Sequence, residues 1–177
     1  ITVYSDYVCP FCYLGRGALD RYQDERDERL TIDWRPFDLR AGKRRPDGSI
    51  DDAVDDGKDD DYYAQARENV RRLQAEYGVD MARDLATDVD SRPAQQASLF
   101  VRETHPEQCA GFDAAIFDAL WQDARDIGDP DVIAELASDV GLDANQVRDA
   151  IASEEWEDRL RDAHRRATHA GIPGVPT

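Results

Sequence analysis

The sequence predicts an α/β fold in which one β-α-β unit is followed by a long helical segment. Residues 1–37 read as strand, helix and strand, and residues 62–169 show helical apolar spacing interrupted at Gly and Pro residues. A chain of 177 residues can bury one sizeable core, whereas a second full domain would be cramped. We therefore expect a single domain that carries an insertion.

The β-α-β unit begins with the β-branched and aromatic run of residues 1–4, which turns at residues 5–6. A helical pattern begins at Pro10 and continues to about Glu28, with apolar residues on one face and charged residues on the other. Residues 30–37 alternate apolar and polar side chains, as a half-buried strand does. A crossover of this kind is right-handed and makes the two strands parallel.

The rest of the chain divides into a loop and a helical insertion. Residues 38–61 are rich in Gly, Pro and Asp, and we interpret them as a solvated acidic loop with little functional role. The following helical pattern has breaks at Gly78, Pro93, Pro106, Gly128–Pro130 and Gly141–Asp143. We therefore expect one domain from residues 1–61 and 151–177, and an inserted helical subdomain from residues 62–150.

Helix ends and the core are also predicted. Asp129 before Pro130 is a good helix start, Asp143 is a candidate cap for the next helix, and Gly171 ends the last one. Two apolar stripes are predicted to pack against each other, namely Phe112, Ile116, Phe117, Leu120 and Trp121, and Val132, Ile133, Leu136 and Val140. Their helical spacing favours a packed core over a cofactor site.

The charge of the chain restricts its partners. There are 39 acidic and 22 basic residues, giving a formal charge of −17 spread along the chain, so nucleic acid and anionic membranes are poor partners. Lys43 and Lys58 are the only lysines, and the Asp-rich, Arg-rich composition resembles that of proteins from salt-loving archaea. No apolar run is long enough for a membrane span and no signal peptide precedes the first strand. We expect a cytoplasmic protein, and export stays open because the chain begins without Met.

The chemistry-bearing motif is Cys9-Pro10-Phe11-Cys12, at the start of the first predicted helix. Two sulfurs one helical turn apart can form a small-ring disulfide. Free N–H groups and the helix dipole lower the pKa of a thiol at this position, so we expect Cys9 to be substantially ionised at neutral pH. Cys9 is then the attacking sulfur and Cys12 the shielded, resolving sulfur. Pro10 and Phe11 set the turn and the desolvation of the pair.

The cysteines allow other interpretations. A zinc site would need His105 and Cys109 as further ligands, and their spacing is interrupted by Pro106. A permanently closed Cys9–Cys12 disulfide is disfavoured because intracellular thiols are normally reduced. Cys109 is more often a buried apolar residue than a regulatory thiol. We therefore expect no metal site, although a protein-binding module with a vestigial or metal-chelating motif remains an alternative.

Three segments together resemble the DsbA family, and within it the FrnE-like branch of predicted dithiol-disulfide isomerases. They are residues 1–15 (ITVYSDYVCPFCYLG), 33–37 (DWRPF) and 171–177 (GIPGVPT). The resemblance implies a thioredoxin-like fold with a large helical insertion and a thiol-disulfide oxidoreductase or isomerase activity. It also implies a cis bond before Pro176, beside the cysteines, which keeps metal ions from the two thiolates.

The same resemblance implies how substrate is held. The backbone N–H and C=O of Val175 would pair with an extended substrate segment, with Pro10, Phe11 and Thr177 as further contacts. No cofactor is expected beyond the redox-active disulfide, with glutathione as a possible co-substrate. An aromatic rim of Tyr7, Phe11 and Tyr13 would suit a protein or a small-molecule thiol or disulfide. We expect a monomer or a homodimer.

The sequence departs from the family in two places. The buried acid that many thioredoxin relatives carry six residues before the first cysteine falls at Val3, and Asp6 has no assigned role. The β-hairpin and final helix that normally follow the cis-proline have no counterpart after Thr177, which favours an incomplete chain. The runner-up function is a glutathione-dependent transferase, or an isomerase of the 2-hydroxychromene-2-carboxylate type. Such sites commonly lack the second cysteine.

Overall fold

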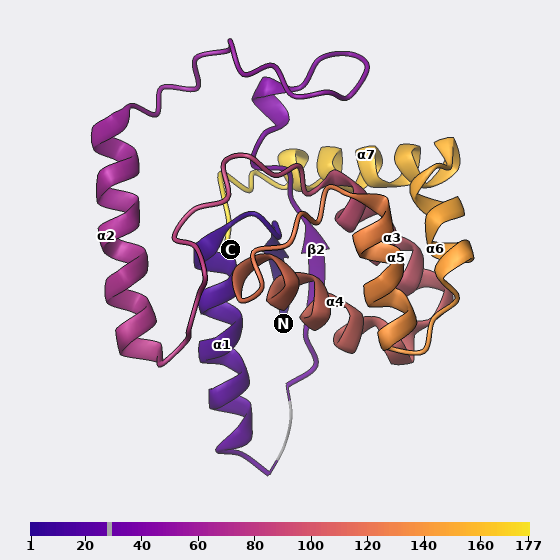
Figure 1. Ribbon diagram of the computed structural model, residues 1–177, viewed down its shortest axis with the longest axis horizontal. Helices are drawn as coiled ribbons and strands as arrows, with labels where there is room; N and C mark the ends of the chain where they lie inside the picture. The colour runs from indigo at the N-terminus through magenta and orange to yellow at the C-terminus, as the bar shows by residue number, and fades with distance from the viewer. Residues whose placement is uncertain (28–29) are drawn as a thin grey trace.

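The computed structural model describes residues 1–27 and 30–177 of the chain (Figure 1). Its elements are β1 (Thr2–Ser5), α1 (Pro10–Asp24), β2 (Asp33–Pro36), the 3₁₀-helix η1 (Ala41–Lys43), α2 (Asp60–Tyr77), α3 (Arg92–Thr104), α4 (Pro106–Trp121), α5 (Pro130–Asp139), α6 (Ala144–Ile151) and α7 (Glu154–His169). The expected α/β fold with a large helical part is confirmed. None of the helices in the described ranges is long and apolar enough to cross a membrane.

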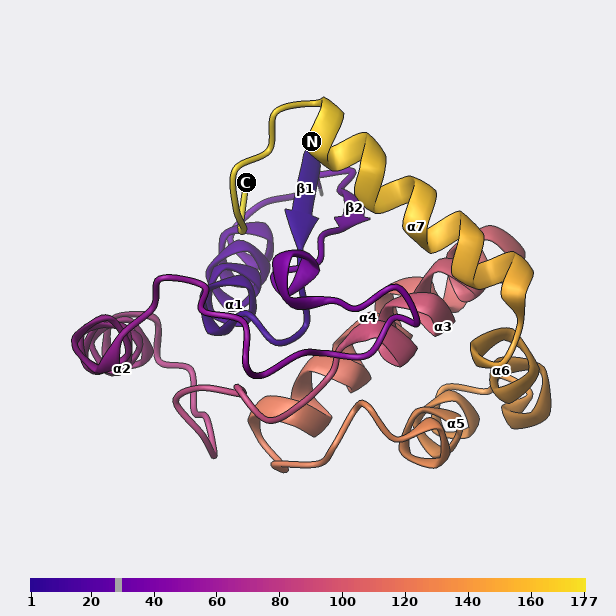
Figure 2. The same cartoon turned by 90° about the horizontal axis from the view of Figure 1, so that it is seen from above.

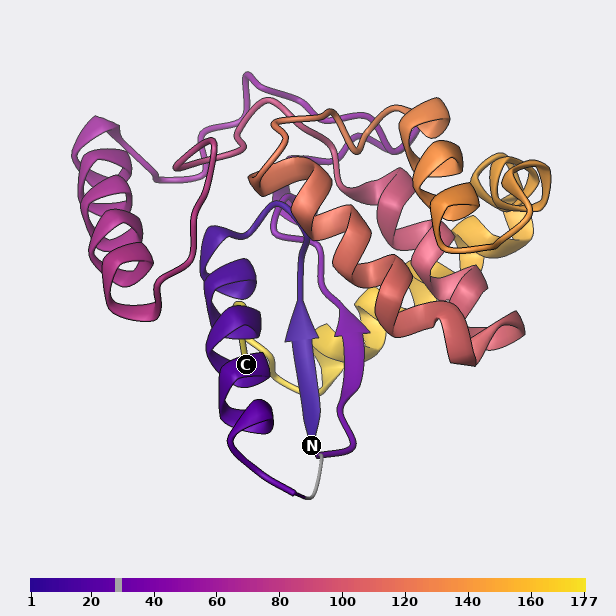
Figure 3. The ribbon, with the colours of Figure 1, turned by 60° about the horizontal axis from the view of Figure 1, so that its bottom comes forward.

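The sheet is small: in the described residues it has two strands, both near the N-terminus, and Thr177 pairs with the outer side of β1. β1 and β2 are parallel, with Thr2 opposite Asp33, which confirms the predicted crossover through α1 (Figure 3). On the other side of β1 the backbone of Tyr4 exchanges two hydrogen bonds with Thr177, of 2.8 and 3.3 Å. β2 is shorter than the predicted strand of residues 30–37. α1 ends at Asp24, and the predicted helix end at Glu28 lies outside the described residues.

Capping residues lie at several helix ends. Asp129 accepts a hydrogen bond from the backbone N–H of Asp131, and Asp143 accepts one from that of Asn145, at 2.8 Å each. These carboxylates satisfy N–H groups that have no partner within the helix. Gly78 ends α2 with a φ of 62°, a left-handed conformation that costs glycine little. The predicted caps at Asp129 and Asp143 and the predicted break at Gly78 are confirmed, whereas the C-cap of α7 is Ala170, with Gly171 following it at a φ of 74°.

The core lies mainly between α4, its neighbours α3 and α5, and the β1–α1 turn. Phe112, Ile116, Leu120 and Trp121 of α4 and Ile133 of α5 are at most 2% exposed, which confirms that both predicted stripes are core. The Trp121 indole donates a hydrogen bond to the backbone oxygen of Tyr7, at 2.9 Å, and so ties α4 to the turn. Seen from above, α7 and α4 lie on opposite sides of the two strands, and α2 stands beside α1 at the edge of the molecule (Figure 2).

The segment predicted as a solvated loop, residues 38–61, is more structured than expected. It contains η1, and its last two residues already belong to α2. Asp38 is 7% exposed because its carboxylate binds the Arg44 guanidinium at 2.5 Å, and Arg44 also binds Asp90 at 2.8 Å. These ion pairs fasten the segment to the residues just before α3. The composition of the segment indicated a loop but not these contacts.

Candidate active site at the start of α1

Cys9 and Cys12 lie at the N-terminal end of α1, directly after the turn that follows β1. Cys9 is the N-cap residue, with extended φ and ψ of −88° and 113°, and Pro10 occupies the first helical position. The backbone oxygen of Cys9 accepts hydrogen bonds from the N–H groups of Cys12 and Tyr13, at 3.1 and 3.3 Å. This first turn places the two cysteines one helical turn apart. Both are free thiols, and they are 3% and 1% exposed.

The opposite wall of the site comes from the end of the chain. The Val175–Pro176 peptide bond is cis. The Cys9 thiol donates a hydrogen bond to the backbone oxygen of Val175, with 3.6 Å between Sγ and O. Pro176 lies over α1, because a Cβ built on Gly15 would be 3.9 Å from its Cγ. Cys9 and Val175, which are 166 positions apart in the sequence, are thus direct neighbours.

Cys9 opens into a groove of about 700 Å³ between α1, the segment after β2, the start of α2 and the C-terminal residues. Pro10, Phe11 and Val175 line this groove with Cys9, so the structure brings these predicted residues together. Cys12 is not part of the lining and lies beneath Cys9. Thr177 is elsewhere: its backbone pairs with Tyr4, and its hydroxyl donates to Gly174 at 2.7 Å.

The protonation of Cys9 differs from the expectation. Its pKa is raised above the ordinary value of 9.0, first by the hydrogen bond with the Cys12 thiol and then by burial and the charge that Cys12 would carry. The backbone N–H of Cys12 lowers the pKa, as expected at a helix start, but does not outweigh these effects. In the reduced pair this direction opposes the expected ionisation of Cys9 at neutral pH. The Cys9 pKa is raised in part because a negative charge on one thiol opposes ionisation of the other.

Asp6 is the charged residue nearest to the cysteines in sequence, and it is 1% exposed. Its carboxylate accepts hydrogen bonds from the backbone N–H of Leu39 at 2.9 Å, from that of Val8 at 3.3 Å and from the side-chain amide of Gln95 at 2.9 Å. Burial raises the pKa of Asp6 from 3.8 to about 6, while hydrogen bonds from Ser91, Leu39 and Val8 lower it. The Asp6 charge in turn raises the pKa of Cys9.

The expected aromatic rim is only partly present. Phe11 lines the groove, but Tyr7 and Tyr13 are 7% and 6% exposed and pack inward. The ring of Tyr7 lies 4.7 Å from that of Phe117, between centroids, and the ring of Tyr13 lies 6.3 Å from that of Trp121. The rim assignment of Tyr7 and Tyr13 is therefore wrong, because α4 covers this side of the turn.

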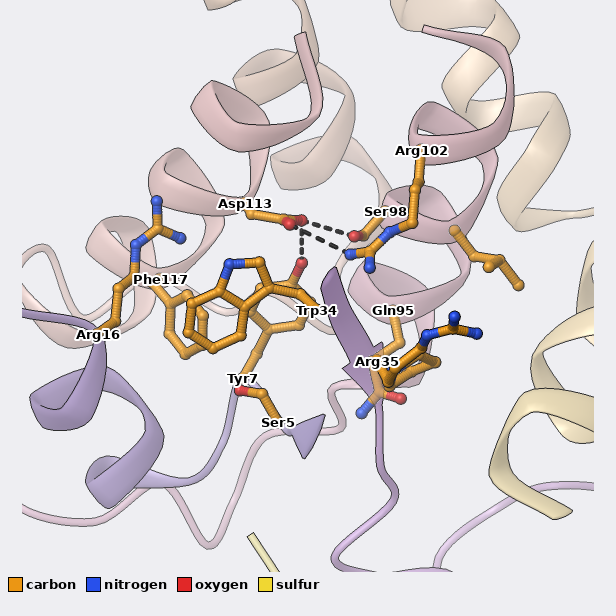
Figure 4. Close-up of a pocket in the computed structure, with 12 residues that line it drawn as sticks. Ser5, Tyr7, Arg16, Trp34, Arg35, Gln95, Ser98, Arg102, Asp113 and Phe117 are labelled. Atoms are coloured by element: carbon orange, nitrogen blue, oxygen red, sulfur yellow. Dashed lines mark hydrogen bonds and ion pairs between the residues drawn. The ribbon is translucent and has the colours of Figure 1, made fainter. Parts of the chain in front are cut away.

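A separate, small cavity of about 30 Å³ lies on that side, between the sheet and helices α3 and α4 (Figure 4). Its polar centre is Asp113, which accepts hydrogen bonds from the hydroxyls of Tyr7 at 2.5 Å and Ser98 at 2.6 Å and pairs with Arg102 at 3.3 Å. Burial and the Asp113 carboxylate raise the pKa of Tyr7. The lining of this cavity contains neither Cys9 nor Cys12, so it is distinct from the groove.

Cys109 lies near this cluster, with its thiol 3.7 Å from the Asp113 carboxylate. Burial, followed by the charge of Asp113, raises the pKa of Cys109 to about 12, which makes it a poor nucleophile. Within the described ranges no group of three or more His, Cys, Asp or Glu side chains is placed to hold a metal ion.

Sequence reasoning missed the residues that the segment after β2 contributes to the groove. Leu39, Arg40, Lys43 and Lys58 all line it, although the segment was expected to have little functional role. One signal was available, since both lysines of the chain fall in this segment.

Comparisons with known proteins agree with this architecture. The sequence pattern of the DSBA-like thioredoxin domain matches residues 1–177. The uncharacterized protein YwbO of Bacillus subtilis is 30% identical over 179 residues, which cover all of this chain and 84% of that protein. Among solved structures, a probable DsbA oxidoreductase from Streptomyces coelicolor superimposes with a TM-score of 0.74 at 23% identity, over 99% of this chain and 77% of the other. A 2-hydroxychromene-2-carboxylate isomerase gives 0.75 at 19% identity, over 99% and 82%. At these identities the structural matches establish the fold.

Proposed function

Because the chain belongs to the family of DSBA-like thioredoxin domains, we propose that it is a thiol-disulfide oxidoreductase in which Cys9 attacks and Cys12 resolves. The observation that carries this proposal is the pair of free thiols one turn apart at the start of α1, with Cys9 against Val175 and at the groove. The resemblance of residues 1–15, 33–37 and 171–177, taken together, further favours the FrnE-like branch of the family.

The reaction consists of two exchange steps. Cys9 loses its proton and its sulfur attacks one sulfur of a substrate disulfide, so that a mixed disulfide forms and the other substrate sulfur leaves as a thiolate, which takes up a proton. Cys12 then loses its proton and attacks the Cys9 sulfur, which releases the second substrate thiol. The substrate disulfide is reduced to two thiols and the protein is oxidised to the Cys9–Cys12 disulfide. The reverse sequence oxidises a dithiol, and the relative stability of the two protein forms sets the direction.

Val175 is placed to hold the substrate during the first step. Its carbonyl accepts the Cys9 S–H hydrogen bond in the reduced protein, and that donor is lost once Cys9 carries a substrate sulfur. The carbonyl is then free to accept a hydrogen bond from an extended substrate, as in β-strand addition. Pro10 and Phe11 line the groove on the α1 side and supply apolar contact.

The test is a redox titration of the purified protein against thiol and disulfide buffers, with alkylation of free thiols read by mass. We expect a reversible transition of two thiols that is lost in both Cys9→Ser and Cys12→Ser. Only Cys12→Ser should trap a mixed disulfide, because it retains the attacking sulfur. Cys109→Ser is the matched control and should titrate like the wild type, since the Cys109 thiol lies beside Asp113, outside the groove.

A single outcome would overturn the proposal. If neither Cys9 nor Cys12 titrates, the oxidoreductase assignment fails and the glutathione-dependent transferase or isomerase becomes the leading function. That alternative predicts turnover of an electrophile with glutathione that persists in Cys12→Ser.

A further inference from the structure

The two lysines of the chain, Lys43 and Lys58, both line the groove beside Cys9. Every other basic side chain apart from histidine is an arginine. The segment that carries the two lysines runs from η1, which ends at Lys43, to the start of α2, and it passes beside α1 (Figure 2). A lysine ammonium is a compact point charge on a flexible stem, so it can follow an anionic group of a ligand more freely than a rigid guanidinium can. The placement of both lysines beside Cys9 therefore indicates a ligand that carries an anionic group.

The two ammonium groups are held by one carboxylate. Asp56 Oδ2 lies 3.8 Å from the Nζ of Lys43 and 3.1 Å from that of Lys58. The side chains of Lys43 and Lys58 are 21% and 33% exposed, so both charges are partly shielded from water and reach the groove. One carboxylate neutralises one of the two positive charges, and the cluster of Lys43, Lys58 and Asp56 keeps a net positive charge.

The other charges that line the groove offset the positive charge of this cluster. Arg40 adds a further positive charge, and its guanidinium donates to the backbone oxygen of Ala86 at 2.5 Å. Asp38 and Asp52 each add a negative charge, and Arg44, which pairs with Asp38, is shared with Asp90. The three basic and three acidic side chains that line the groove therefore balance, in a chain of net charge −17. An anion is therefore repelled less at the groove, whose lining charges balance, than by the acidic surface as a whole.

The remainder of the groove is largely apolar and of the size of a small-molecule site. Phe11, Phe37, Leu39 and Tyr62 contribute to its walls, and its volume of about 700 Å³ falls in the range of roughly 300–1,000 Å³ that is usual for such sites. Resting on the proposed function, we propose that Lys43 and Lys58 select small disulfides that carry carboxylate groups. The carboxylate would lie at the two ammonium groups while the disulfide reaches Cys9.

The test compares two chromogenic disulfides of different charge with the reduced protein. The anionic probe is 5,5′-dithiobis(2-nitrobenzoate), and the uncharged probe is 4,4′-dithiodipyridine at about pH 8. We expect the ratio of the anionic to the neutral rate constant to fall roughly ten-fold in the double variant Lys43→Gln/Lys58→Gln, because each partly shielded charge contributes up to about 1 kcal/mol. Added salt should lower the wild-type ratio, since it screens the attraction.

Three further variants sharpen the comparison. Arg72→Gln removes a basic side chain of α2 that is ion-paired with Glu76 and does not line the groove, so the ratio should stay unchanged. Lys43→Arg/Lys58→Arg keeps the charge and should keep most of the preference. Asp56→Asn should raise the ratio, because the carboxylate that competes with the substrate anion is removed.

The outcomes separate this inference from the proposed function. If the wild type reacts with the neutral probe through Cys9, but the ratio is the same in the wild type and the double variant, the lysine assignment is overturned while the oxidoreductase stands. If Cys9 reacts with neither probe, the proposed function itself fails. Should the double variant lose its fold, the rise or constancy of the ratio in Asp56→Asn decides the question.

Discussion

Gln95 of α3 donates a hydrogen bond from its side-chain amide to the Asp6 carboxylate, with 2.9 Å between Nε2 and Oδ1. The side-chain oxygen Oε1 of Gln95 accepts a hydrogen bond from Nε2 of His164 in α7, at 2.7 Å. The pKa of His164 is lowered to about 4, chiefly by burial, so the ring is neutral at pH 7 and donates through Nε2–H. This row of hydrogen bonds connects α7 through α3 to the turn that carries Cys9.

The raised pKa of Asp6 predicts an unusual pH dependence. Its folded value of about 6 exceeds the ordinary 3.8, so the fold favours the protonated carboxyl. The stability from this group is fully present below about pH 4 and is lost as the pH rises through 6, at a cost of about 3 kcal/mol. In Asp6→Asn the free energy of unfolding should therefore improve relative to wild type between pH 4 and 7, measured by urea denaturation. A difference between the two proteins that does not change with pH would contradict the burial of a titrating Asp6.

Gln95 and Gln96 form a natural matched pair for the second prediction. Both side chains are buried. The Gln95 amide donates a hydrogen bond to Asp6, whereas the Gln96 amide donates to the backbone oxygens of Ala150, Ile151 and Ser153. Replacing either by Leu should cost about 1–3 kcal/mol, because buried partners lose their hydrogen bonds. Only Gln95→Leu should raise the pKa of Asp6 further. This pKa can be measured from the pH dependence of the ¹³C chemical shift of the Asp6 carboxyl. An equal shift in Gln96→Leu would show that the effect is not local.

Cys12 should control the ionisation of Cys9. Since the hydrogen bond with Cys12 is the largest cause of the raised Cys9 pKa, removing that thiol should lower the pKa. We expect the rate at which iodoacetamide alkylates Cys9 to reach half its maximum at a lower pH in Cys12→Ala than in the wild type. Cys109→Ser serves as the control and should leave the midpoint in place. A midpoint that stays or rises in Cys12→Ala would assign the raised pKa to burial alone.

Two tyrosines near the turn allow a paired test of burial. Tyr7 donates to Asp113, which is 5% exposed, whereas Tyr13 donates to Asp118, which is exposed. Tyr7→Phe should destabilise the protein by about 1–3 kcal/mol, because a buried carboxylate loses a donor that water cannot replace. Tyr13→Phe should cost less, since water can reach Asp118. Equal losses in thermal denaturation would indicate that ring packing, rather than the hydroxyl, decides both.

The net charge of −17 predicts that stability rises with salt. The screening length shortens from about 10 Å at 0.1 M to about 3 Å at 1 M, which weakens the repulsion among the acidic side chains. We expect Tm, measured by circular dichroism, to rise by several degrees in KCl over this range, because about 1 kcal/mol shifts the Tm of a chain of this size by about 2–4 °C. Sucrose at matched osmolality controls for solute exclusion. A Tm that is independent of salt would count against the repulsion.

Much of the fold could be predicted because its signals are local. The caps at Asp129 and Asp143, the stripes on α4 and α5 and the position of Cys9 at a helix start all depend on residues a few positions apart. The environment of these residues could not be predicted in the same way. Residue spacing does not indicate that α4 covers Tyr7, and composition does not indicate that Arg44 fastens an acidic loop.

The pKa of Cys9 illustrates the same limit at the site. Its position at a helix N-terminus can be predicted from the sequence, and this position by itself lowers the pKa of Cys9. The depth of burial and the contact with the Cys12 thiol are set by elements that arrive later in the chain, and they raise it. The sign of the net shift therefore depends on tertiary structure.

The contact between Cys9 and Val175 has a consequence for biosynthesis. Val175 follows Cys9 by 166 positions, so both cysteines are synthesised well before the residue whose carbonyl contacts Cys9. Until Val175 has been translated and residues 173–177 have docked beside α1 and β1, this wall of the groove is missing. The order of synthesis thus delays assembly of the site around the two thiols.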